Sequence, residues 1–203
     1  AIKPAGVIST DEPGGMPSLL RQALGNENAD IRTVHRLDQA VGGVMVYART
    51  KQAAAALSRA IQEGRMEKEY LAVLTKPMAE ASGTLRDLLY HDRVKNKTYV
   101  VKRKRNGVKE AVLDYETLAS GAEGTLIHVH LHTGRTHQIR VHFAALGHPL
   151  LGDALYGGDA SLLARPALHS AAADLTQPVT GQLLHITAPV PDDLRVFGFE
   201  RYL

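Results

Sequence analysis

The chain has 203 residues, with 24 Lys and Arg against 21 Asp and Glu, and it contains no cysteine. This length predicts one domain, which can have two lobes. Without cysteine, a disulfide scaffold, a thiolate nucleophile and Cys-ligated zinc or iron–sulfur sites are excluded. No apolar run reaches the roughly 18 residues of a membrane span, and the first residues do not resemble a signal peptide. We therefore expect an intracellular protein.

The first half of the chain predicts short strands and two helices. Helices typically begin with a threonine just before the first turn or a proline within it. They typically end with a glycine just after the last turn. Pro17 and Gly25 bracket one helix in this way, and Thr50 and Gly64 bracket another. In chain order we expect a strand end at residues 2–7, a helix at 17–24, a strand at 44–48 and a helix at 51–63.

The second half is rich in β-type residues and carries one further helix. Apolar residues and histidines alternate over residues 125–131, which is the pattern of a half-buried strand. Asn106-Gly107 lies between two β-rich runs and predicts a hairpin that joins them. The other expected elements are strands at 70–74, 97–102, 111–118 and 183–190, and a helix from about 136 to 146. Together they predict an α+β fold with a largely antiparallel sheet.

Six of the ten histidines fall between His128 and His148, and three of them share one face of the predicted strand. Imidazoles at alternating strand positions can bind zinc. However, zinc-bound histidines usually have carboxylate partners, and no Asp or Glu occurs from Gly124 to Gly152. We therefore expect these histidines to lie on a polar strand face or against RNA, and we expect no metal site.

Positive charge is concentrated between Arg93 and Lys109. This 17-residue segment has eight basic residues and no acidic one. Such a concentration favours a surface that faces phosphates. The alternative is a hairpin whose basic tip is only solvated. Because aromatic residues make up 5% of the chain and Trp is absent, a platform that stacks single-stranded bases is not expected.

Two charged residues outside this segment are candidates for chemistry. Asp38 ends the run Val34-His35-Arg36-Leu37-Asp38, and an aspartate before Gly42-Gly43 is equally typical of a turn or cap. Arg140 lies on the helix predicted from about residue 136 to residue 146, on the same face as Ala144. If it is buried, its guanidinium needs a phosphate or a carboxylate. Otherwise it extends into solvent.

Six short motifs, taken in order, resemble those of the RluA-type pseudouridine synthases, almost from end to end of the chain. They are Lys3-Pro4-Ala5-Gly6; His35-Arg36-Leu37-Asp38 with Gly43 and Ala48-Arg49-Thr50; Lys68-Glu69-Tyr70; Gly134 to His142 with Gly147 to Gly157; Leu168-His169-Ser170; and Pro189-Val190-Pro191-Asp192. One departure is Val41-Gly42-Gly43, where the family often has Thr-Ser-Gly, so a hydroxyl contact from that turn is absent.

The resemblance implies a fold and an activity. We expect one catalytic domain over residues 1–203, of which a few preceding residues are missing, and no appended RNA-binding domain. Its mixed, largely antiparallel sheet would carry helices and loops on its sides and an active-site cleft across it. The implied reaction converts uridine in structured ribosomal or transfer RNA to pseudouridine. It uses no cofactor and no metal. We also expect a cytoplasmic monomer that binds no membrane.

By the same resemblance Asp38 is the essential catalytic residue, Arg140 pairs with it, and Tyr70 packs against the target base. The Asp38 carboxylate could add to carbon 6 of the base, attack carbon 1′ of the ribose, or abstract a ribose proton to give a glycal. Tyr70 could instead be an ordinary core residue. His35 is expected to be structural or to contact RNA. The residues expected to bind RNA are Arg36, which would fill the space of the flipped base, and Lys102, Arg103, Lys104, Arg105, Arg135 and His137.

Two other functions are compatible with parts of the sequence. One is a catalytically silent RNA-binding protein on the same scaffold, which would not need Asp38, Tyr70 and Arg140 together. The other is a metalloenzyme that uses histidine ligands. The motifs favour the isomerase over both.

Overall fold

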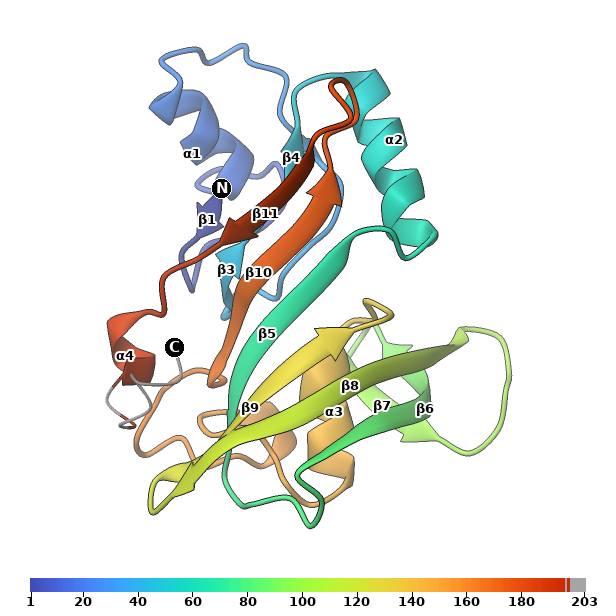
Figure 1. Cartoon of the computed structure of the whole chain (residues 1–203), viewed down its shortest axis with the longest axis vertical. Helices are drawn as coiled ribbons and strands as arrows, with labels where there is room; N and C mark the ends of the chain where they lie inside the picture. The colour runs from blue at the N-terminus through green and yellow to red at the C-terminus, as the bar shows by residue number, and fades with distance from the viewer. Residues whose placement is uncertain (196, 198–203) are drawn as a thin grey trace. The chain divides into compact units, whose positions relative to one another are not determined.

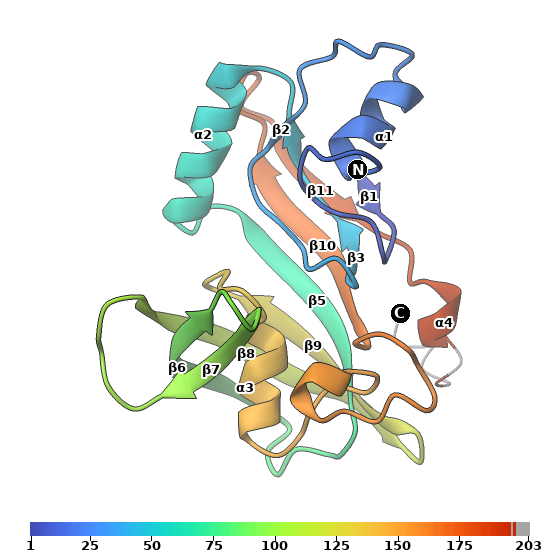
Figure 2. The ribbon, with the colours of Figure 1, turned by 180° about the vertical axis from the view of Figure 1, so that it is seen from behind.

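A computed structural model describes residues 1–195 and 197, which form two compact units. The first unit contains Ala1–Lys68 and Ser170–Pro189, and the second contains Glu69–His169 and the chain from Val190. Strands β5 (Glu67–Leu74) and β10 (Leu168–Thr176) each pass from one unit into the other. Figures 1 and 2 show the ribbon from opposite sides.

The first unit consists of short antiparallel strands and two helices. Strand β1 pairs with β3, β2 pairs with β4, and the end of β10 pairs with β11. Its complete elements are β1 (Ile2–Lys3), α1 (Met16–Ala23), β2 (Arg32–Thr33), β3 (Gly42–Val44), β4 (Tyr47–Ala48), α2 (Lys51–Gln62) and β11 (Leu183–Thr187). A core that includes Val44, Leu57 and Leu175 joins α2 to the strands.

Both helices predicted for this unit are confirmed. Pro17 lies in the first turn of α1, as its fixed φ allows. At the start of α2, the Thr50 hydroxyl accepts a hydrogen bond from the amide of Ala53 at 3.1 Å. Gly64 follows the helix with φ +69°, a conformation that other residues rarely adopt.

The predicted continuous strand over residues 44–48 is wrong. The chain leaves β3 after Val44 and enters β4 at Tyr47. Between the two strands, the Met45 amide donates to the Ala1 carbonyl at 2.8 Å, and the Val46 amide donates to Nε2 of His35 at 3.0 Å. These two amides therefore make no hydrogen bonds within a strand ladder. The apolar run resembles one strand, but its two ends belong to two separate sheets.

The second unit is an antiparallel sheet in the order β5-β9-β8-β6-β7. Helix α3 lies on one face of it, behind β8 and β9 in Figure 1 and in front of them in Figure 2. The remaining elements are β6 (Ser82–Asp92), β7 (Lys97–Val101), β8 (Val108–Gly121), β9 (Gly124–Leu131), α3 (Gln138–Ala145), the 3₁₀ turn η1 (Ala154–Tyr156) and α4 (Asp192–Arg195). These elements confirm the predicted α+β class.

The alternation predicted for β9 is confirmed. Ile127, Val129 and Leu131 are buried, whereas the histidines between them are half-buried. From α3, Phe143 is fully buried and meets the ring of Tyr115 edge-on at 5.7 Å. The apolar face of the sheet is therefore the face on which α3 packs.

The hairpin predicted at Asn106-Gly107 is wrong, because β6 lies between β7 and β8. No pattern in the sequence predicted β6. The true hairpin joins β6 to β7, where the Asp92 carboxylate accepts hydrogen bonds from the amides of Val94 and Lys95, both at 3.0 Å. Asn96 completes this turn with φ +45°. Gly107, with φ +82°, turns the separate loop that carries the chain from β7 to β8.

The last predicted strand is shorter than expected. It ends at Thr187 rather than at Val190, and α4 follows after Pro191. Pro189 and Pro191 have no amide hydrogen to donate, so they cannot extend the ladder. Within residues 1–195 and 197, no helix is both long and apolar enough to cross a membrane.

Candidate functional site

In the first unit, the backbone on both sides of Asp38 is tied to residues 3–9. The Ser9 hydroxyl donates to the carbonyl of Leu37 at 2.7 Å and accepts from its amide at 3.1 Å. On the other side, the Gln39 carbonyl accepts from the amide of Gly6 at 2.8 Å. Asp38 itself closes a turn, but it does so through its carbonyl, which accepts from Val41 at 3.0 Å. Its half-buried carboxylate is thus presented by a fixed loop.

The same loop is held by a buried ammonium that sequence reasoning missed. Lys3 is 1% exposed, and its Nζ donates to the carbonyls of Pro4 at 3.0 Å, Val7 at 2.6 Å and Gln39 at 3.0 Å. Charged donors make stronger hydrogen bonds than neutral ones. Lys3 therefore fastens the N-terminal strand to the Asp38 loop. Its position in the first motif was the available signal, although nothing local showed what it would bind.

His35 and Arg36, which precede Asp38, differ in their surroundings. Nε2 of His35 accepts the Val46 amide, and burial, followed by the nearby Lys68 ammonium, lowers the pKa of His35 to about 4. A neutral, hydrogen-bonded ring fits the structural role that was one of its two expected roles. Arg36 is exposed to solvent, as a residue that meets RNA must be.

In the turn that departs from the family pattern at residues 41 and 42, Gly43 keeps the family's glycine. Its φ is +122°, and a Cβ there would lie 2.1 Å from the carbonyl oxygen of Ser170. Only glycine permits this approach. Val41, which stands where the family often has a threonine, is 1% exposed and packs in the core.

In the second unit, Arg140 on α3 is buried and holds a carboxylate. Its Nε donates to Oδ2 of Asp153 at 2.7 Å, and its Nη2 donates to Oδ1 at 2.8 Å. The guanidinium carbon also lies 5.1 Å from the centre of the Tyr156 ring. Of the alternatives left open for Arg140, the buried one is confirmed, and a protein carboxylate is among its anions.

Sequence reasoning missed Asp153 as a partner of Arg140. A signal was available, because Asp153 is the first acidic residue after the long acid-free stretch that ends at Gly152. Tight packing fixes its loop. A Cβ at Gly152 would lie 1.9 Å from the carbonyl oxygen of Arg165, and one at Gly158 would lie 1.9 Å from that of Leu150.

Tyr156 supports this cluster through its hydroxyl. The hydroxyl accepts from the Thr98 amide at 2.8 Å, donates to the Thr98 carbonyl at 3.2 Å and lies 3.0 Å from Nδ1 of His137. Burial raises the pKa of Tyr156, so the hydroxyl keeps its proton at neutral pH. His137 is 8% exposed and precedes α3 with φ +55°. Its contact with RNA stays a prediction.

The loop before α3 is fastened to β8 by Gln138. Its Oε1 accepts from the Thr133 hydroxyl at 2.8 Å and from the Arg135 amide at 3.0 Å, while Nε2 donates to the Val112 carbonyl at 3.0 Å. Arg135 also donates from Nε to the Glu110 carbonyl at 2.9 Å, and its side chain is partly exposed. The segment from Thr133 to Arg140 is therefore a rigid entry into the helix.

Tyr70 lies on β5 opposite Val129 and is 6% exposed. It shares the second unit with Arg140, whereas Asp38 belongs to the first. The expected pairing of Asp38 with Arg140, and the role of Tyr70 at the base, therefore stay predictions.

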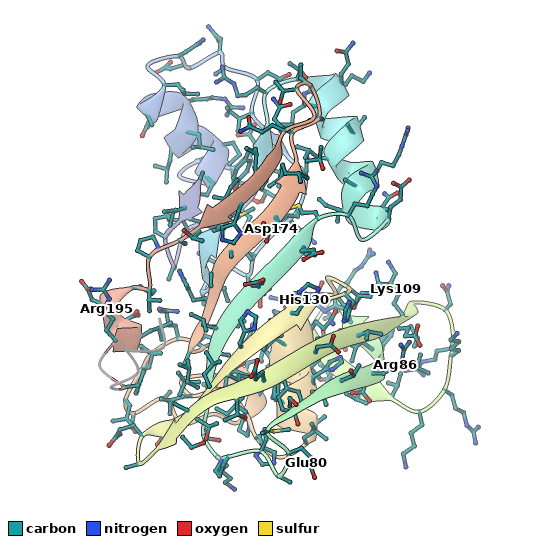
Figure 3. All side chains as sticks on the ribbon, in the orientation of Figure 1. Glu80, Arg86, Lys109, His130, Asp174 and Arg195 are labelled. Carbon is teal, nitrogen blue, oxygen red and sulfur yellow. The ribbon has the colours of Figure 1, made fainter. Side chains whose placement is uncertain are left out.

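The basic segment occupies two successive connections, the one from β6 to β7 and the one from β7 to β8. The Asp92–Lys97 turn carries Arg93 and Lys95, and the β7–β8 loop carries the four consecutive cations Lys102, Arg103, Lys104 and Arg105, all exposed. Figure 3 labels Lys109 where β8 leaves this loop. The loop lines an open concavity of about 490 Å³, and Arg105 stacks 4.9 Å from the Tyr90 ring. The basic segment is thus divided between two connections and is not the tip of a single hairpin.

The strand-face histidines have carboxylate partners after all, supplied by neighbouring strands. His128 pairs with Glu69 of β5 at 3.2 Å, and His132 pairs with Asp114 of β8 at 2.6 Å. His130, labelled in Figure 3, meets the His132 ring edge-on at 4.9 Å. Hydrogen bonds from Thr84 and then from His132 lower the pKa of Asp114. Among residues 1–195 and 197, no three His, Asp or Glu side chains are grouped so that they could hold a metal ion.

The sequence and the fold match one known family. Residues 2–145 match the family described as RNA pseudouridylate synthase, and the chain therefore belongs to that family. It is 35% identical to an uncharacterised RNA pseudouridine synthase of Bacillus subtilis, YhcT, over 95% of this chain and 66% of the relative. It is also 35% identical to ribosomal large subunit pseudouridine synthase D of Nitrosomonas europaea, over 95% of this chain and 59% of the relative.

Solved structures agree with this assignment. Human RNA pseudouridylate synthase domain containing 1 is 26% identical, with a TM-score of 0.76 over 93% of this chain and 78% of that one. Human RNA pseudouridylate synthase domain containing 4 has a TM-score of 0.79 over 98% and 87% of the two chains; at 22% identity it supports the fold alone. The chain spans 59–66% of the length of the two bacterial relatives.

Proposed function

We propose that this protein is an RNA pseudouridine synthase that isomerises uridine in structured RNA. The observation that carries the proposal is the family match over residues 2–145, because that range contains Asp38, Tyr70 and Arg140. In the reaction, the bond from ribose carbon 1′ to N1 breaks and a bond from carbon 1′ to carbon 5 forms. The proton on carbon 5 leaves and N1 gains one. The atoms and electrons of the isomerisation therefore balance without an oxidant, water or a cofactor.

Asp38 is the proposed catalytic carboxylate, and Arg140 is its proposed partner. A carboxylate withdrawn from water tends to become protonated unless a positive group faces it. Arg140 is suited to that task because its guanidinium is buried and always charged. Asp153 occupies the Nε–Nη2 edge, so a second carboxylate would meet the Nη1 side. Addition to carbon 6, attack on carbon 1′ and formation of a glycal all begin from ionised Asp38.

Tyr70 is proposed to pack against the target base. A uridine in a stem must be flipped out to reach an enzyme, at a cost of a few kcal/mol. Stacking on an aromatic ring stabilises a bound base by about 1–3 kcal/mol, which offsets part of this cost. The exposed guanidinium of Arg36 is proposed to occupy the vacated space in the RNA stack.

The RNA phosphates are proposed to bind the exposed cations of the basic segment, chiefly Lys102 to Arg105. Arg135 and His137, at the entry to α3, are the other proposed contacts. Each neutralised phosphate releases counterions, so binding should weaken steeply with salt. Because one relative is named for the large ribosomal subunit, ribosomal RNA is the first substrate to test and transfer RNA the second. A cytoplasmic monomer is proposed as well.

The test measures tritium released from carbon 5 of uridine-labelled RNA, together with chemical mapping of pseudouridine in RNA from cells with and without the protein. Asp38→Asn should abolish release while RNA affinity stays within about tenfold. Asp30→Asn is the matched control, since Asp30 is an exposed aspartate of the same unit that pairs with Arg32 at 2.8 Å; it should retain full activity. A fully active Asp38→Asn protein would end the assignment. RNA binding without any isomerisation by the wild type would indicate the silent binding protein instead.

A further inference from the structure

Arg140 and Asp153 form an ion pair that is closed off from water. Their side chains are 8% and 1% exposed, and two hydrogen bonds of 2.7 and 2.8 Å join them. Taking both charges out of water is costly, and well-packed apolar residues are often at least as stable as a buried pair. Fold stability alone is therefore a weak explanation for this pair.

Asp153 is the fixed member of the pair. Its side chain is short, and its carbonyl accepts from the amides of Tyr156 at 3.0 Å and Gly158 at 2.8 Å. The glycines on either side of it pack so closely against other backbone that a Cβ there would clash. Arg140, by contrast, has a long side chain with several rotatable bonds. The rigid carboxylate therefore sets the place of the flexible guanidinium, and not the reverse.

Tyr156 constrains the guanidinium from a second direction. Its ring centre lies 5.1 Å from the guanidinium carbon of Arg140, and its hydroxyl is bound to Thr98 and His137. The carboxylate fixes the guanidinium along its Nε–Nη2 edge, while the aromatic ring restricts movement towards the tyrosine. The Asp153 carboxylate and the Tyr156 ring together hold the guanidinium in the orientation that the structure shows.

We propose that Asp153 is a positioning residue for the isomerisation, which holds the Arg140 guanidinium so that its Nη1 side can meet a second carboxylate. This inference rests on the proposed function, in which that carboxylate is Asp38. Asp153 itself contacts neither base nor ribose in this scheme. A misplacement of about 1 Å at a reacting group can lower a rate about a hundredfold, so the role has a measurable consequence.

The first experiment compares two identical substitutions. Asp153→Asn removes the charge with little change in shape, and it should lower kcat about 30- to 100-fold while KM stays within about threefold. Asp193→Asn is the matched control, because Arg165 and Asp193 form a similar two-bond pair at 2.7 and 2.6 Å nearer the surface. It should change kcat by less than about twofold. An Asp153→Asn enzyme as active as the control would overturn the proposal.

A double-mutant cycle tests whether Asp153 acts through Arg140. Asp153→Asn should change kcat by less than about threefold in the Arg140→Lys background, because residues that act as a unit are not additive. Additive effects would overturn the proposal. If Asp153→Asn does not fold, Asp153→Glu replaces it in both experiments. It keeps the charge, and its extra methylene should still displace the guanidinium and lower kcat about tenfold.

A second readout is independent of activity. The Nε–H signal of Arg140, assigned in a ¹⁵N spectrum by its loss in Arg140→Lys, should exchange slowly with water in the wild type. Exchange should become at least about tenfold faster in Asp153→Asn and stay unchanged in Asp193→Asn. A signal that stays protected in Asp153→Asn would refute the positioning role whatever the activity. A wild type inactive on every RNA would refute the proposed function, while this readout would still show whether Asp153 holds the Arg140 guanidinium.

Discussion

Acid should destabilise the first unit through His35. Its pKa is lowered to about 4, mainly by burial and then by Lys68, whereas the same residue in the unfolded chain titrates near 6.5. As pH falls through 6.5, the unfolded state gains a proton that the folded state refuses, so stability declines until about pH 4. At about 1.4 kcal/mol per pH unit, the loss over this window is about 3 kcal/mol. Above pH 6.5 the contribution of His35 is constant.

The assay is urea unfolding of the wild type and His35→Gln at intervals from pH 7.5 to 4. The glutamine oxygen can still accept the Val46 amide but cannot become charged. The stability of the wild type relative to the variant should therefore fall by about 3 kcal/mol across the range. His185→Gln, which removes an exposed histidine paired with Asp174 at 2.8 Å, is the control and should follow the wild type within about 1 kcal/mol. Parallel curves for wild type and His35→Gln would refute the reasoning.

Three further predictions concern the loops and the basic segment. Lys3→Met removes the donor to three carbonyls and should cost about 3 kcal/mol in urea unfolding; a loss below about 1 kcal/mol would contradict the anchoring role. Gly43→Ala should cost more than about 2 kcal/mol, because its Cβ would strike Ser170. Gly64→Ala, with open space around it, should cost only about 1 kcal/mol; equal losses would disprove the steric argument. Replacement of residues 102–105 by Gln should weaken RNA binding in filter assays and reduce the slope of log affinity against log salt by up to about 3. An unchanged slope would mean that these cations are only solvated.

The two units give the proposed chemistry different supports. In the first, Lys3 and Ser9 hold the backbone on both sides of Asp38. In the second, Asp153 and Tyr156 hold the side chain of Arg140.

Local signals in the sequence were reliable because their causes are local. The Thr50 cap, the proline of α1 and the glycine after α2 each act within one turn of helix, and all were correctly predicted. The alternation over residues 125–131 depends only on the period of a strand, and it was confirmed too. The order of the six motifs was enough to indicate the family.

Pairings between distant residues could not be read in this way. β6 separates β7 from β8 although the chain between those two strands contains a good hairpin signal, because strand order depends on the whole sheet. Likewise, Glu69 and Asp114 reach the histidines of β9 from neighbouring strands that are far away in sequence. Because the sequence around those histidines contains no Asp or Glu, it had predicted that they would lack carboxylate partners.

By itself, the sequence determined where helices start and stop, which face of β9 is apolar, and which family the chain resembles. Caps, periodicity and motif order carry that information within a few residues. Only the tertiary structure decided that Asp153 holds Arg140, that Lys3 ties the strand to the Asp38 loop, and that β6 lies between β7 and β8. The physical reason is that a buried charge is tolerated only beside its partner, and the fold decides which distant residues become neighbours.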